Sequence, residues 1–207
     1  GIGASVMEAN TTGTQNVAIG YGCLRGGTNV YDGTNANVAI GYLCGSNVGD
    51  NATNNVLIGY ECVKATSTSE FVGENNTYIG YQCGLVNIGG SENVGMGVDC
   101  LKANTTGNQN VAIGKECLQA NATGANNVAA GTYSLRFNTT GDGNVATGHY
   151  SLYSNTTASY NVATGREALK ENTTASWNTA TGYYSLKANT TGDKNVATGF
   201  STLLNNT

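Results

Sequence analysis

The chain of 207 residues contains no proline and a single histidine, and only 11% of its residues are charged. So little charge excludes a disordered polyelectrolyte. Nine Lys and Arg against thirteen Asp and Glu leave no basic stripe to neutralise phosphates, so we expect no nucleic-acid partner. No apolar run approaches the length of a membrane-spanning helix, so we expect no membrane insertion of this segment.

Residues that carry chemistry are also scarce. The lone His149 has no recurring Ser/His/Asp, Cys/His or paired-carboxylate pattern around it. The cysteines form no CxxC pair, and no aspartate lies in a calcium-binding repeat. The sequence therefore predicts a protein that is not an enzyme, with no catalytic residues, no metal site and no cofactor.

What the chain does contain is a repeat. The phrase Asn-Val-Ala-Ile/Thr-Gly, or a near variant, occurs eleven times, with spacings of 21, 18 and 21 residues and then 17 throughout. A fixed short period is typical of solenoids, in which each unit buries its apolar face against its neighbours. We expect one continuous domain over 1–207, with irregular coils and loop insertions over 21–75 and regular 17-residue coils over 76–207. The copies begin at Asn16, Asn37, Asn55, Asn76, Asn93, Asn110, Asn127, Asn144, Asn161, Asn178 and Asn195.

Each repeat reads as one coil. Its opening alternates with the period of two of a β-strand, with Val and Ile on one face and Ala on the other. Gly ends the strand, a second short strand is expected to follow, and Asn-Thr-Thr supplies the returning turn. The fold class predicted is all-β: a parallel β-solenoid, specifically a narrow two-sheet β-roll. The insertions near Gly26–Thr34 and Ala65–Phe71 should project as loops.

The Val and Ile columns should form an apolar stripe. Ala and Ser can fill so thin a roll, which would leave the larger aliphatic side chains pointing outward along its whole length. An exposed stripe of that length indicates a partner surface, and identical chains bury such stripes most simply by rotational symmetry. The residues expected to pack there are Val17, Ile19, Val38, Ile40, Val56, Ile58, Val94, Val111, Ile113, Val128, Val145, Val162 and Val196.

The phrase Asn-Val-Ala-Ile-Gly, followed three places later by a small residue, resembles the head repeat of YadA-like trimeric autotransporter adhesins. The longer phrase over Gly148–Thr157 is similar to repeats in tail fibres of bacteriophages from aquatic environments. The resemblance implies a left-handed β-roll in which three chains surround one axis and turn their Val and Ile columns toward it. This chain departs from the adhesin pattern in its 17-residue coil, its Asn-Thr-Thr turns and its cysteines.

All six cysteines lie three residues after a repeat Gly, where Ser134 and Ser151 stand in later coils. Stacked coils would make them a column of thiols, which we expect to be buried, reduced and inert. Disulfides between adjacent coils remain a geometric alternative. Free thiols favour a fibre assembled in a reducing cytoplasm over an exported adhesin. The column is Cys23, Cys44, Cys62, Cys83, Cys100 and Cys117.

Two further columns have competing interpretations. Tyr21, Tyr42, Tyr60 and Tyr81 follow the Gly of their coils, where stacking on one another is favoured over contact with a surface glycan. The Thr column over Thr147–Thr198 would suit ice binding if it were flat and exposed. The many Asn-x-Thr triplets match glycosylation sequons, but their fixed phase marks them first as turns.

These patterns favour a homotrimeric segment of a phage tail fibre, located on the virion and acting as a stiff spacer in host attachment. Its partners would be its own copies and a host surface glycan or protein. The alternatives are the head of a trimeric adhesin on the bacterial cell surface, and a monomeric ice-binding or extracellular matrix solenoid. Because both termini fall inside a repeat, we expect the chain to be the middle of a longer fibre.

Overall fold

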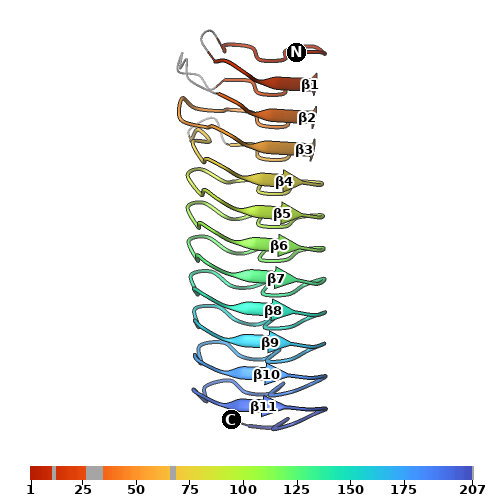
Figure 1. Ribbon diagram of the computed structural model, residues 1–207, viewed down its shortest axis with the longest axis vertical. Coiled ribbons are helices and arrows are strands. Elements are labelled where there is room, and N and C mark those ends of the chain that lie inside the picture. The colour runs from red at the N-terminus through yellow and green to blue at the C-terminus, as the bar shows by residue number, and fades with distance from the viewer. Residues whose placement is uncertain (11–12, 27–34, 66–68, 207) are drawn as a thin grey trace.

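The computed structural model describes residues 1–10, 13–26, 35–65 and 69–206, and confirms a parallel β-solenoid. Coil lies above coil in a straight rod with the termini at opposite ends (Figure 1). Each coil contributes one strand to a single sheet whose order follows the sequence. The strands are β1 (Val17–Tyr21), β2 (Val38–Tyr42), β3 (Val56–Tyr60), β4 (Thr77–Ile79), β5 (Val94–Met96), β6 (Val111–Ile113), β7 (Val128–Ala130), β8 (Val145–Thr147), β9 (Val162–Thr164), β10 (Thr179–Thr181) and β11 (Val196–Thr198).

Every strand pairs in parallel with its neighbours, and the register matches the repeat. Ala112 of β6 pairs with Ala129 of β7, and the same phase holds from β1 to β11. Each repeat position therefore becomes a column along the rod. Among the residues that the structure describes, no helix has the length and apolar character needed to cross a membrane.

The strands alternate as the sequence predicts. In β6 the central Ala112 is fully buried, whereas Val111 and Ile113 lie on the outer face. The Ala column therefore faces the lumen, where only a small side chain fits between the sheet and the opposite wall of the coil.

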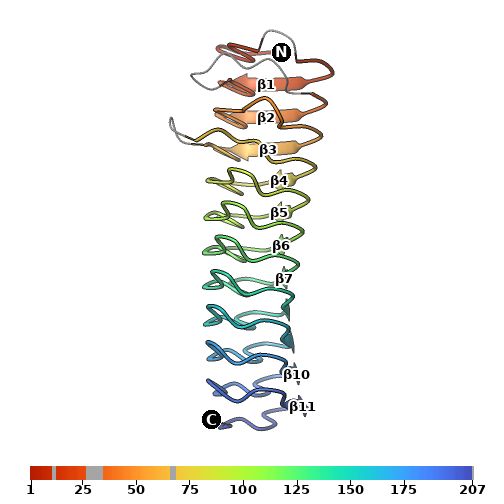
Figure 2. The same ribbon diagram turned by 90° about the vertical axis from the view of Figure 1, so that its left-hand side faces the viewer.

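The second strand of the predicted two-sheet roll does not form in the described coils. Cys117 and Leu118 are consecutive, yet both are fully buried, which the alternation of a strand does not allow. Glu116 and Leu118 have φ of 54° and 48°, and these left-handed residues turn both side chains of the Cys-Leu pair inward. One sheet is thus closed by a wall of turns, seen edge-on in Figure 2.

Two buried asparagine ladders hold the coils together. In the first, the Oδ1 of Asn93 accepts hydrogen bonds from the backbone N and the Nδ2 of Asn110, at 2.9 and 3.1 Å. In the second, the Nδ2 of Asn121 donates to the Oδ1 of Asn104 at 2.8 Å and to the Gly124 carbonyl at 2.9 Å. These ladders satisfy polar groups that a narrow lumen shields from water.

Two coils place a larger side chain at the lumen position of Ala: Leu57 in β3 and Tyr78 in β4. The second shows how neighbouring residues make room for it. Tyr78 takes the place of the lumen Ala and is fully buried, with its hydroxyl accepting from Asn87 Nδ2 at 3.2 Å. Its ring fits because Gly84 stands where other coils have Leu and Gly95 where they have Ala. A Cβ built on Gly84 or Gly95 would lie 2.9 or 2.8 Å from the Tyr78 ring.

The irregular coils lie at the N-terminal end. There β1, β2 and β3 have five residues each, against three in every later strand. Isolated bridges, such as the one between Val48 and Phe71, extend the pairing on the other side of these coils. Most of the first predicted loop, residues 27–34, and the tip of the second, residues 66–68, lie outside the described residues.

Candidate interaction surfaces

The outer face of the sheet is a flat apolar stripe along the rod. Ile113 and Val128 are 45% and 36% exposed, because each strand turns its first and third residues away from the lumen. Of the thirteen residues predicted to pack between chains, none is buried in the single chain. Val17, Ile19, Ile113, Val128, Val162 and Val196 are exposed, and Val38, Ile40, Val56, Ile58, Val94, Val111 and Val145 are half-buried.

The stripe changes character along its length. Over β1–β6 both outward columns are apolar apart from Thr77, and neither column carries a charge anywhere. From β8 to β11 the second column consists of Thr147, Thr164, Thr181 and Thr198, all exposed and paired in register. The lower half of the face is therefore a hydroxyl ladder beside an aliphatic one, although its backbone continues unchanged.

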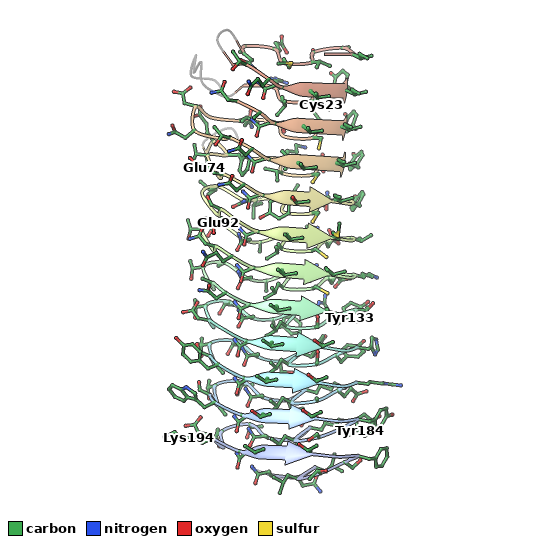
Figure 3. The ribbon with its side chains drawn as sticks, in the orientation of Figure 1. Cys23, Glu74, Glu92, Tyr133, Tyr184 and Lys194 are labelled. Atoms are coloured by element: carbon green, nitrogen blue, oxygen red, sulfur yellow. The ribbon has the colours of Figure 1, made fainter. Side chains whose placement is uncertain are left out.

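The six predicted thiols form a buried column, and all are free. The Sγ of Cys117 donates to the carbonyls of Ile113 and Gly131 at 3.2 and 2.7 Å, while the Ser134 hydroxyl lies 3.4 Å from the same sulfur. Cys23, labelled in Figure 3, is the first cysteine of this column. The column therefore packs and hydrogen-bonds within the wall of the solenoid.

This environment makes Cys100 and Cys117 poor nucleophiles. The hydrogen bond between Cys117 and Cys100, together with burial, raises the pKa of Cys117 far above its ordinary value. For Cys100 that same bond lowers the pKa, but the hydrogen bond with Cys83 and burial outweigh it and raise the pKa to about 12. Since the thiolate is the reactive form, little is available at neutral pH.

The four predicted tyrosines stack as a ladder on one edge of the rod. Ring centroids are 5.4 Å apart from Tyr21 to Tyr42, 5.1 Å from Tyr42 to Tyr60 and 5.2 Å from Tyr60 to Tyr81, with nearly parallel planes. Both faces of Tyr42 and Tyr60 are therefore covered by neighbouring rings. Those two rings leave only their edges and hydroxyls for a glycan, which binds aromatic residues chiefly through their faces.

Residues that the repeat pattern had marked only as turns have a structural role. Asn104, Asn121, Asn138, Asn155, Asn172 and Asn189 begin Asn-x-Thr triplets but are fully buried in the second asparagine ladder. Their amide nitrogens are engaged in hydrogen bonds, so glycosylation in the folded rod is sterically excluded. The sequence does hold a sign of the second ladder: Asn recurs without exception at two places in every regular coil, whereas a turn alone would also accept other residues.

In the part of the chain that the structure describes, no three His, Cys, Asp or Glu side chains gather as a metal site would need. Compared with known proteins, the chain matches no protein-family model, no curated protein and no solved structure.

Proposed function

We propose that this chain is a rod segment of a homotrimeric attachment fibre, in which three copies bury their Val and Ile stripes around a common axis. The observation that supports the proposal is the exposed, uncharged stripe on an in-register sheet that runs from β1 to β11. Burying exposed aliphatic side chains contributes about 25 cal/mol for each Å² removed from water. Every coil except that of β10, whose outward residues are Thr179 and Thr181, adds such a contribution.

The fibre would be a phage tail fibre on the virion, acting as a stiff spacer in attachment to the host surface. The resemblance of the repeat to tail-fibre repeats supports this location, and the buried free thiols suit assembly in a reducing cytoplasm. The head of a bacterial surface adhesin is the alternative with the same architecture. Electron microscopy with antibodies raised against this segment distinguishes the two, because label on purified virions supports the fibre and label on uninfected cells supports the adhesin.

Light scattering on the purified segment tests the assembly. We expect a mass three times the chain mass of 21.2 kDa. Val128→Glu places a charge on the stripe and should give monomers, because an unpaired carboxylate cannot be buried between chains. Thr123→Glu adds the same charge at an exposed turn position away from the stripe and should leave the trimer intact. A monomeric unmodified segment with a water-exposed stripe would refute the proposal.

The Thr ladder of β8–β11 favours ice binding as a second candidate. Its four hydroxyls are exposed on a flat, in-register sheet, which meets the condition that the sequence left open. A monomer that inhibits ice recrystallisation, and loses this property in Thr164→Tyr but not in Thr123→Tyr, would support it. Thr123 is exposed in a turn away from the sheet and serves as the matched control.

A further inference from the structure

The edge of the rod beyond the C-terminal ends of the strands collects cations and aromatic rings over the coils of β6–β10. Between residues 115 and 187 this edge has five cationic side chains against the three carboxylates Glu116, Glu167 and Glu171. We call it the basic–aromatic edge and define it by Lys115, Arg136, Tyr150, Arg166, Lys170 and Lys187. Tyr133 and Tyr184 mark it in Figure 3, on the side opposite Lys194.

The lower part of the edge is organised around one sunken carboxylate. The Oε2 of Glu167 lies 3.0 Å from Lys187 Nζ and 3.2 Å from Lys170 Nζ, and its Oε1 lies 3.5 Å from Arg166 Nε. The Glu167 side chain is only 7% exposed, whereas that of Arg166 is 52% exposed. Three cations therefore surround the sunken Glu167, and against Glu167 and the exposed Glu171 they leave this part of the edge with a net charge of +1 (three cations minus two carboxylates).

The upper part repeats the arrangement with two cations. Glu116 is 12% exposed and its Oε2 lies 2.7 Å from Arg136, while its Oε1 lies 3.5 Å from Lys115. Glu116 and Glu167 are three coils apart, which at the spacing of β-strands is about 14 Å. The edge thus carries two separate clusters of positive charge, one around Glu116 and one around Glu167, which we call the positive nodes.

Aromatic rings fill the coil between the nodes. Tyr133 stacks on Tyr150 with ring centroids 5.0 Å apart, and Tyr153 meets Tyr150 edge-on at 4.9 Å. Arg136 lies 5.3 Å from the Tyr133 centroid and Lys170 lies 5.2 Å from that of Tyr150. These contacts hold the cations against the rings and give the edge a defined surface.

We propose that the basic–aromatic edge binds an anionic polysaccharide that lies along the rod. Two positive nodes match a polymer with widely spaced acidic groups. Tyr133 and Tyr150 stack on one another and hold Arg136 and Lys170 against their rings, so they offer ring edges and hydroxyls, rather than faces, to the sugars between the acidic groups. A nucleic acid suits the edge poorly, because its phosphates are closely spaced and the chain carries a net charge of −4. The proposal deepens the attachment role proposed above, from which it takes its biological meaning, but the edge is complete within one chain.

Fluorescence anisotropy in 20 mM salt with a labelled hyaluronan hexasaccharide, in which only every second sugar carries a carboxylate, tests this binding directly. We expect saturable binding that weakens at 500 mM salt, because exposed charges are then screened. Arg166→Gln with Lys187→Gln should raise the Kd at least tenfold, while Lys170 keeps Glu167 paired. Arg25→Gln with Lys194→Gln removes two charges from other exposed sites and should change the Kd less than twofold. Circular dichroism on both variants controls for folding.

Four results would overturn the proposal: no binding of the hyaluronan hexasaccharide, equal binding of neutral maltohexaose, tighter binding of hexathymidylate, or equal losses in the two double variants. Light scattering on the same samples separates this proposal from the assembly. A trimer that does not bind contradicts only the polysaccharide, and a monomer that binds contradicts only the trimer.

Discussion

The side-chain oxygen of Asn110 accepts two hydrogen bonds from Asn127 in the next coil, 3.0 Å from its backbone N and 3.1 Å from its Nδ2. Asn127 in turn donates to the Gly141 carbonyl at 2.9 Å and accepts from Asn144 through its own Oδ1. Each asparagine is therefore both donor and acceptor between two neighbours. The ladder links consecutive coils from β1 to β11, independently of the sheet.

Asn127→Ala should lower the free energy of unfolding by about 3 kcal/mol. It leaves the buried backbone N of Asn144 without its acceptor, and it removes one of two hydrogen bonds from Asn110 Oδ1 and from the Gly141 carbonyl. Guanidinium denaturation measures the change. Asn108→Ala is the control, since its one side-chain hydrogen bond, from the Ser91 backbone N, is exposed. That variant should lose no more than about 1 kcal/mol, and equal losses in both variants would contradict a special role for the buried ladder.

Gly165→Ala should destabilise the rod by about 1–3 kcal/mol or more. Gly165 has φ of 131°, and a Cβ there would lie 2.5 Å from the Gly182 carbonyl oxygen of the next coil. Thermal unfolding compares it with Gly89→Ala, where a Cβ meets nothing closer than 4.0 Å. The Gly89 variant should unfold within about 0.5 kcal/mol of the unmodified chain, and the same result for Gly165 would show that its close approach is not required.

The pair Tyr78 and Gly84 should behave as a unit. Tyr78→Ala alone should cost about 3–5 kcal/mol through the cavity it leaves, and Gly84→Leu alone about 1–3 kcal/mol through overpacking. The double variant restores the Ala and Leu of other coils, such as Ala112 and Leu118, so its loss should be smaller than the sum. A double-mutant cycle measures the coupling. Strict additivity would mean that the two side chains do not share one space.

The buried thiols should make the rod sensitive to alkali. The hydrogen bond with Cys117 lowers the pKa of Cys100, but the hydrogen bond with Cys83 and burial outweigh it and raise the pKa from 9.0 to about 12. Between these pH values the unfolded chain therefore loses a proton that the folded chain keeps. The free energy of unfolding should therefore fall as the pH rises from 9 towards 12. Denaturation at pH 7.5 and 10.5 measures the fall.

Cys100→Ser serves as its control. The variant should lose about 1–2 kcal/mol at pH 7.5, the scale for a buried hydroxyl with partial compensation. It should also show a smaller loss between the two pH values than the unmodified chain. Thiol counting in denaturant without reductant should give six thiols per chain. Fewer would show that coils are joined by disulfides and would favour an exported adhesin.

The sequence by itself determined the parallel solenoid, its coil length and its columns. With a fixed period of 17 residues, residues at the same position of the repeat lie directly above one another in successive coils. Val111 and Val128 must therefore share a column, whatever the details of the coil. Alternation over Val111–Ile113 likewise predicted which face Ala112 would take, because side chains of a strand alternate. The exposed stripe and the column of thiols followed from the same reasoning.

The tertiary structure alone decided how each coil closes. The sequence over Glu116–Leu118 suggested a strand, but left-handed backbone at both ends of this segment turns Cys117 and Leu118 into the lumen together. The local sequence does not predict this left-handed backbone, since leucine ordinarily avoids positive φ. The free energy gained by filling the lumen offsets the conformational cost at Leu118. The asparagine ladders also needed the stacked coils, because each hydrogen bond joins residues 17 positions apart in the regular coils.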